Sequence, residues 1–321
     1  MKRHLRRLRL AAILAVTFAH MASAGVTYFV DAARPDDSGA GTNWDTAKKI
    51  IQSAISLTTA GDVVLVTNGL YNLGGATNFT EGTGLTNRVC VSNAITVQAV
   101  SANPADTCIC GAPDPSTGNE GDAAVRGVYL AGGAKLIGFT VSNGYCKTWT
   151  AAARGGGVYA QTTSSVISNC VITTNRAYYG GGIYFNQQGW CYDSTVSNNV
   201  GYLGGGVYAG TYTNCFVTLN VGYNGGGVYN GTHYYCQIIT NRAQNLGGGG
   251  VQGSYYNCRI SSNNAAGNGG GLYAPTLAQD CEIRDNRSGA QGGGAYAGTY
   301  KGCRVNYNTS VGWGGGFYSA T

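Results

Sequence analysis

Residues 251–273, VQGSYYNCRISSNNAAGNGGGLY, hold one full copy of a unit that recurs through more than half of this 321-residue chain. Each copy opens with a run of glycines followed by an apolar residue. Those apolar residues are Val158, Ile183, Val207, Val228, Val251, Leu272, Ala295 and Phe317, at intervals of 21 to 25 residues. A repeat of this length is typical of a solenoid, in which each unit packs only on its neighbours.

Two further columns keep step with the glycines. The first is made of cysteines, with Ser194 filling one place: Cys170, Cys215, Cys236, Cys258, Cys281 and Cys303. The second follows five residues later and is made of asparagines: Asn175, Asn199, Asn220, Asn241, Asn263, Asn286 and Asn308. Because three residue types hold one register, the coil of the solenoid is about 22 residues long.

The local pattern indicates strands. Segments such as Cys236–Ile238 and Cys258–Ile260 place apolar residues two apart, which is the period of a strand with one buried face. Short strands separated by Gly and Asn turns predict an all-β fold, a right-handed single-stranded parallel β-helix. We expect glycines and asparagines at its corners, since both accept left-handed backbone conformations.

The repeats divide the chain. Residues 151–321 form the regular array, and residues 25–150 read as an N-terminal cap with irregular first coils. Within the cap, Trp44, Ala47, Ile51, Ala54 and Ile55 fall on one helical face after the cap candidates Asn43 and Asp45. We expect this helix to cover the open edge of the first coil. No cap is visible at the last repeat, so the natural chain is expected to continue beyond Thr321.

Residues 1–24 read as a secretory signal peptide, cleaved after Ala24. A basic start leads into the apolar run 10–19 and the small-residue site Ala22–Ala24, and that run is too short to span a bilayer. Its five basic residues contribute five units to the formal net charge of +6 of the full chain. We therefore expect a nearly neutral, secreted or cell-surface protein, with no nucleic-acid partner and no transmembrane segment in the mature chain.

Two stretches carry a family resemblance: Gly61–Tyr71 (GDVVLVTNGLY) and Leu136–Gly144 (LIGFTVSNG) resemble the entry coils of pectin-lyase-like β-helix proteins. That fold carries lyases, hydrolases and adhesins alike. The segment Ile260–Tyr273 is similar to the repeats of polymorphic outer-membrane protein adhesins, in which FxxN is followed by GGA and an aliphatic residue. Here Ile260 stands in place of the Phe, and a third glycine in place of the Ala.

Catalytic side chains are scarce. His233 is the one histidine after residue 24, and it shares a column with Tyr212, Tyr255 and Tyr300, which predicts a stacked surface residue. The candidate acids are Asp280, Glu282 and Asp285. Asp280 and Glu282, two apart on a strand, would face the same side, at a spacing that paired glycosidase carboxylates could use. Glu282 also aligns with Arg259 and Arg304 of the adjacent coils, which predicts a charged surface ladder instead.

No cofactor is expected, although one loop has oxygen ligands that suit calcium. Asp106, Asp114, Glu120 and Asp122 lie among Pro, Gly and Asn residues, without the spacing of a known calcium loop. A solvated acidic loop is the alternative.

The eleven cysteines allow two interpretations. Those in the column alternate with Ile or Val, so they would face inward and pack as small apolar thiols. Cross-linking is the alternative in an exported protein. Cys90, Cys108, Cys110, Cys146 and Cys191 lie outside the column and are the better disulfide candidates.

The remaining surface signal is aromatic. One tyrosine follows the inward apolar residue in most repeats, and alternation would turn it outward, with Gln252 as the exception. These tyrosines are Tyr159, Tyr184, Tyr208, Tyr229, Tyr273, Tyr296 and Tyr318. They could bind sugar rings or a surface protein, or they could be a ladder that shields the sheet. The sequence thus favours a scaffold with a binding or adhesive role, for which polysaccharide is a candidate ligand, over the alternative of a polysaccharide lyase or glycoside hydrolase.

Overall fold

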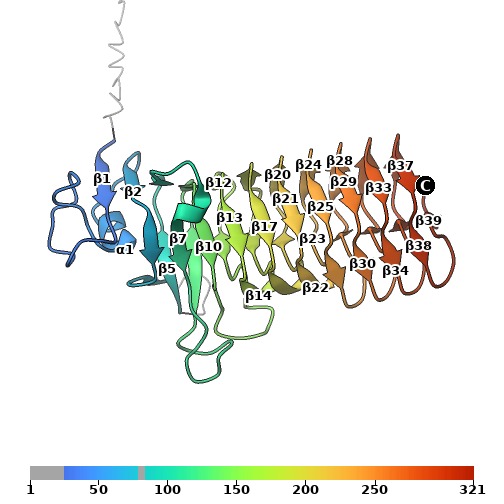
Figure 1. The fold of residues 1–321 in the computed structure, drawn as a ribbon, viewed down its shortest axis with the longest axis horizontal. Helices are drawn as coiled ribbons and strands as arrows, with labels where there is room; N and C mark the ends of the chain where they lie inside the picture. The colour runs from blue at the N-terminus through green and yellow to red at the C-terminus, as the bar shows by residue number, and fades with distance from the viewer. Residues whose placement is uncertain (1–24, 79–83) are drawn as a thin grey trace, which may run out of the picture.

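The computed structural model describes residues 25–78 and 84–321, so the predicted signal peptide lies outside the described residues. The described chain is an all-β solenoid, a parallel β-helix, whose coils follow one another along the long axis (Figure 1). Every strand pairing that joins consecutive coils is parallel, and the hairpin of β4 with β5 is antiparallel.

Four sheets run along the described part of the solenoid, and we call them A to D. Sheet A consists of β1 (Thr27–Val30), β2 (Val63–Val66), β6 (Thr96–Ala99), β9 (Lys135–Ile137), β12 (Val166–Ser168), β16 (Trp190–Tyr192), β20 (Thr211–Thr213), β24 (Thr232–Tyr234), β28 (Ser254–Tyr256), β32 (Leu277–Gln279) and β36 (Tyr300–Lys301). Sheet B consists of β3 (Gly69–Tyr71), β7 (Thr107–Cys110), β10 (Thr140–Ser142), β13 (Val171–Thr173), β17 (Thr195–Ser197), β21 (Phe216–Thr218), β25 (Gln237–Ile239), β29 (Arg259–Ser261), β33 (Glu282–Arg284) and β37 (Arg304–Asn306).

Sheet C consists of β4 (Ala76–Asn78), β5 (Leu85–Val91), β8 (Val125–Leu130), β11 (Val158–Ala160), β15 (Ile183–Phe185), β19 (Val207–Tyr208), β23 (Val228–Tyr229), β27 (Gly250–Val251), β31 (Leu272–Tyr273), β35 (Ala295–Tyr296) and β39 (Phe317–Tyr318). Sheet D consists of β14 (Arg176–Tyr179), β18 (Val200–Leu203), β22 (Val221–Asn224), β26 (Arg242–Ala243), β30 (Asn264–Ala265), β34 (Arg287–Ser288) and β38 (Thr309–Ser310). Each regular coil passes through sheets A, B, D and C in that order, and the next coil begins again in sheet A.

The asparagine column lies inside the coil, not at a left-handed corner as the sequence had indicated. The left-handed residue is the one before it: Thr240, with φ of 59°, precedes the buried Asn241. The Asn241 side chain donates to the carbonyl of Val217 (2.9 Å) and to Oδ1 of Asn263 (3.1 Å). The Asn241 amide also donates to that Oδ1 (2.9 Å). The same bonds recur from Asn175 to Asn308, so a ladder of buried amides ties each coil to the next.

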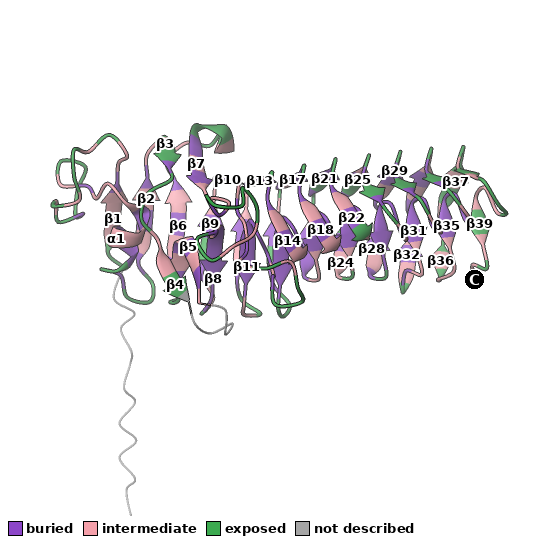
Figure 2. Cartoon of the chain, turned by 90° about the horizontal axis from the view of Figure 1, so that it is seen from below, coloured by how far each residue is buried: buried purple, intermediate pink, exposed green. Residues whose placement is uncertain are grey.

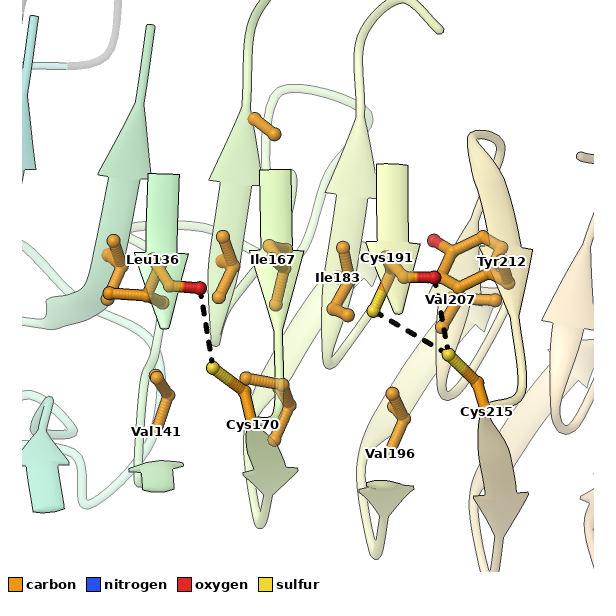
Figure 3. Close-up of a cluster of buried hydrophobic side chains, with 14 of the residues drawn as sticks. Leu136, Val141, Ile167, Cys170, Ile183, Cys191, Val196, Val207, Tyr212 and Cys215 are labelled. Atoms are coloured by element: carbon orange, nitrogen blue, oxygen red, sulfur yellow. Dashed lines mark hydrogen bonds between the residues drawn. The ribbon is translucent and has the colours of Figure 1, made fainter. Parts of the chain in front are cut away.

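The interior is a narrow apolar stack (Figure 2, purple). In most strands of sheets A and B its residues alternate with exposed or half-buried ones, as in Gln237, Ile238 and Ile239 of β25. The column cysteines lie within this stack, fully buried except for the half-buried Cys303. Figure 3 shows Cys170 and Cys215 among Ile167 and Val196, where small thiols fill the space between aliphatic side chains.

One coil departs from the register that the sequence indicated. Gly250, and not Val251, pairs with Val228 and Leu272 at the inward position, so Val251 stands where its neighbours have tyrosine. A Cβ on Gly250 would lie 2.4 Å from the hydroxyl oxygen of the buried Tyr255. The ring of Tyr255 therefore occupies the volume that a valine or leucine fills in the adjacent coils.

The predicted N-terminal helix is much shorter than expected. Helix α1 (Ile51–Ile55) has five residues and buries Ile51, Ala54 and Ile55 in the core next to the first coils. Trp44 lies before it and packs edge-on against Phe29. Asn43 accepts from the Thr46 amide (2.9 Å) in a turn, which is why a cap-like residue there starts no helix. A short 3₁₀ helix, η1 (Pro104–Asp106), precedes β7.

Candidate functional site

The tyrosines of sheet C form a ladder of stacked rings. Ring centroids of successive members lie 5.0 to 5.6 Å apart from Tyr129 through Tyr229, and 5.1 to 5.4 Å apart from Tyr273 to Tyr318. Two predicted ligand residues are not at the surface, because Tyr159 and Tyr184 are only 2% and 8% exposed. The other predicted ligand tyrosines are half-buried: Tyr208, Tyr229, Tyr273, Tyr296 and Tyr318.

Stacking limits what this ladder can present to a ligand. Each ring covers a face of its neighbour, so the ring edges and hydroxyl groups remain for contact with solvent. The ladder is interrupted once, at Val251, between Tyr229 and Tyr273. A sugar ring can therefore stack on an aromatic face only at the end of a ladder, where one face of the last ring is uncovered.

A second aromatic ladder, on sheet D, was missed in the sequence. Tyr178, Tyr202 and Tyr223 stack with centroids 4.5 and 4.7 Å apart. Each stands three residues after a column asparagine, a spacing that could have identified them. In the next coil Gln244 takes the equivalent position, so no further tyrosine covers the outer face of Tyr223, which is 38% exposed.

This second ladder borders a groove of about 280 Å³. Its lining includes Trp149, Arg176, Val200, Tyr202, Val221, Tyr223 and Gln244. The Arg176 guanidinium lies over the Trp149 ring, 4.2 Å from its centroid, and pairs with Glu120. The groove therefore combines aromatic and aliphatic surface with the amide of Gln244, a composition typical of small-molecule and sugar sites.

The three candidate catalytic acids do not form a pair across a groove. Asp280 has φ of 53° in the turn before β33. Contrary to the prediction, it therefore does not share a strand face with Glu282. Glu282 pairs in register with Arg259 and Arg304, as the coil alignment indicated, and its carboxylate lies 3.6 Å from Arg259 Nε and 3.1 Å from Arg284 Nε. Asp285 accepts from Arg284 Nη1 at 2.5 Å. The arrangement is an exposed charged network.

We expect Glu282→Gln to lower the free energy of unfolding by less than about 1 kcal/mol, because exposed ion pairs contribute little. The difference from the unmodified protein should shrink further in high salt, where these charges are screened. Urea denaturation at low and high salt measures both effects. If Glu282→Gln instead abolished the cleavage of a polysaccharide while the protein remained folded, the carboxylate would be catalytic.

The four candidate calcium ligands bind other protein groups. Asp106 accepts from the Ser101 hydroxyl (2.6 Å), Glu120 pairs with Arg176, and Asp122 lies 3.7 Å from Lys147 Nζ. Asp114 accepts from the hydroxyl (2.6 Å) and the amide (2.8 Å) of Ser116, and these bonds with the Ala123 amide lower its pKa. Over residues 25–78 and 84–321, no three His, Cys, Asp or Glu side chains are grouped as a metal site.

His233 is fully buried inside the coil, so its predicted place on the surface is wrong. Its ring stacks between Tyr212 and Tyr255, with centroids 5.1 and 5.0 Å away. Nε2 lies 3.2 Å from the carbonyl oxygen of Asn230, and Nδ1 has no hydrogen-bond partner among the described residues. Burial lowers the pKa of His233 to about 4, so the ring is neutral near pH 7.

Three of the cysteines outside the column do not show the predicted cross-links. Cys108, Cys110 and Cys191 are free thiols in the structure. Cys191 lies in the core, with its sulfur 3.8 Å from that of Cys215, well beyond an S–S bond (Figure 3). Cys90 packs beside the Tyr129 cluster, and Cys146 packs in a separate cluster with Leu85.

In the described part of the chain, no helix has the length and apolar character needed to cross a membrane. No protein-family model matches the sequence, and no curated protein matches it.

Among solved structures, the chain is similar to pectate lyase Pel9A, with 13% identity over 93% of this chain and 79% of the lyase and a TM-score of 0.49. It is also similar to a rhamnogalacturonan lyase, with 18% identity over 86% of this chain and 73% of that one and a TM-score of 0.37. The pectin methylesterase from Aspergillus niger shares 14% identity over 92% of this chain and 89% of the esterase, with a TM-score of 0.42. At this distance no activity or site residue is transferred to this chain, and its parallel β-helix is defined by its own strand pairing.

Proposed function

We propose that this chain is an extracellular or cell-surface β-helix scaffold that binds polysaccharide on the aromatic groove of sheet D. The observation that carries the proposal is the end of the tyrosine ladder at Tyr223, where a ring that no further tyrosine covers lies beside Gln244. An aromatic face contacts the apolar side of a sugar ring, and the neighbouring amide can bond its hydroxyl groups.

The carboxylates support binding over catalysis. Glu282 and Asp285 lie in an exposed network with arginines, and Asp280 occupies a turn. A glycoside hydrolase needs two carboxyl groups that flank the scissile bond. Trp149, Arg176 and the tyrosines line the groove, and none of the described residues that line it carries a carboxylate.

The proposal predicts that the purified protein is retained by at least one polysaccharide in an immobilised panel. Tyr223→Ala should weaken that retention by about tenfold, which corresponds to the loss of one stacking contact. Tyr234→Ala is the matched control, because Tyr234 is a stacked strand residue on sheet A with similar exposure, 36% against 38%.

The two variants and an assay for cleavage products separate the outcomes. Equal retention of both variants would place the binding site elsewhere, and retention by no polysaccharide would contradict the function itself. Release of shortened chains from any polysaccharide would show that the protein is an enzyme.

A further inference from the structure

A second depression crosses the turns that join sheet C to sheet A. It is a trough of about 300 Å³, and sheet C separates it from the aromatic groove of sheet D. Gly210, Gly231 and Gly253, from three successive coils, lie along it. A longer turn, residues 186–189, also contributes to its lining. In the next coil the equivalent turn has only two residues, Ala209 and Gly210.

The glycines of the trough have unused hydrogen-bond donors. Their carbonyl groups accept from the amides of Thr232 (2.9 Å), Ser254 (2.9 Å) and Thr276 (2.8 Å). Their own N–H groups donate to no acceptor among the described residues. Neighbouring coils are about 4.8 Å apart, so the trough contains a row of peptide donors at that interval. An N–H group with no acceptor in the protein bonds to water or to a ligand, and an oxygen-rich ligand would satisfy it.

These turns require glycine. Gly231 has φ of 95°, and a Cβ there would lie 2.7 Å from the carbonyl oxygen of Gly210 in the previous coil. The absence of side chains lets the backbones of successive coils approach closely at Gly231 and Gly253, and at Gly210 the Phe185 ring occupies the space of a Cβ.

Besides Phe185 and Ala209, the side chains around this row are neutral amides and hydroxyls. They belong to Asn186, Gln187, Gln188, Asn230, Thr232, Ser254 and Thr276. Each of these groups both donates and accepts, which matches a sugar hydroxyl. No charged residue lines the trough, so a carboxylate or sulfate there would lack a counter-charge.

We infer that the trough is a second binding site, which holds a segment of a neutral glycan along the axis of the solenoid. This inference rests on the proposed function, since it assumes a polysaccharide ligand. The peptide donors bond sugar oxygens in successive coils, and the amides and hydroxyls on either side bond the remaining hydroxyl groups.

Two substitutions test the trough without altering its turns. Asn230→Ala removes one amide, and Ala209 already occupies the same turn position, with φ of 56° against 62° for Asn230. Thr232→Trp fills the trough, and Trp190 already stands in the same row two coils earlier. Both substitutions are made in a Tyr223→Ala background, so that binding in the aromatic groove contributes little to the measured affinity.

Titration calorimetry with cellohexaose, mannohexaose and hexagalacturonate is then run at low and high salt. We expect at least one neutral oligosaccharide to bind, with an affinity that salt leaves unchanged. Asn230→Ala should weaken that binding about three- to tenfold, and Thr232→Trp by more than about tenfold.

Three outcomes would overturn the inference. If both variants bind as the parent does, the trough is not the site, while retention that depends on Tyr223 would leave the proposed function intact. Salt-sensitive binding of hexagalacturonate alone would show an anion site instead of a neutral one. If no oligosaccharide binds to any form, and no polysaccharide retains the unmodified protein, the inference and the proposed function fail together.

Discussion

Asn263→Ala should lower the free energy of unfolding by about 4 kcal/mol. The Asn263 side chain donates to the carbonyl of Ile238 (2.8 Å) and to Oδ1 of Asn286 (3.0 Å). It also accepts from the backbone amide of Asn241 (2.9 Å). Alanine would remove the acceptor that the buried backbone amide and side-chain amide of Asn241 share, and each buried donor left unpaired costs about 1–3 kcal/mol. Urea denaturation followed by circular dichroism measures the change.

Asn264→Ala is the matched control, because Asn264 is the next residue in the chain but lies exposed on β30. Its backbone amide donates to the carbonyl of Asn241 (2.9 Å) and would do so unchanged after the substitution. We expect it to cost less than about 0.5 kcal/mol. Equal losses from the two variants would mean that the buried ladder contributes no more than an exposed amide does.

His233 should make the protein sensitive to mild acid. Its pKa is about 4 in the folded chain, below the ordinary value of 6.5 that the unfolded chain would show. Between these values the unfolded state binds more protons than the folded state, so the free energy of unfolding falls as the pH drops from about 6.5 towards 4. A difference of this size corresponds to roughly 3 kcal/mol.

His233→Phe isolates this contribution, because it keeps a ring between Tyr212 and Tyr255 and cannot titrate. Urea midpoints measured from pH 7 to pH 4 should fall more steeply for the unmodified protein than for the variant. Parallel pH profiles would show that the imidazole is solvated or protonated inside the coil, contrary to its burial. Carboxylates titrate in both proteins, so only the difference between the two profiles reports on His233.

Much of this architecture was visible in the sequence, because each column repeats a physical requirement coil after coil. The alternation of Cys258 and Ile260 predicted an inward face, and the coil alignment predicted that Glu282 lies between Arg259 and Arg304. The parallel sheets followed from these periods. The length of helix α1 could not be predicted in this way, since the helical pattern from Trp44 to Ile55 also fits a turn followed by five helical residues.

The candidate site was harder to predict from the sequence, because it depends on which of two strand faces is buried. Tyr255 and Tyr229 have the same chemistry, yet Tyr255 points inward, where Gly250 leaves space for its ring. The same ambiguity placed His233 on the surface. The groove and the trough depend on turn lengths and on contacts between coils, and no single repeat encodes these. The Trp149 ring beneath the Arg176 guanidinium is one such contact.

The pairing of each coil with only its two neighbours has a consequence for how such a chain can change length. Asn241 and Asn263 are 22 residues apart and occupy equivalent rungs, so removal of one whole coil would join surfaces that already fit together. Loss of a single residue within a strand would instead turn every following side chain of that strand to the opposite face. Viable length variants of this architecture are therefore expected to differ by complete turns.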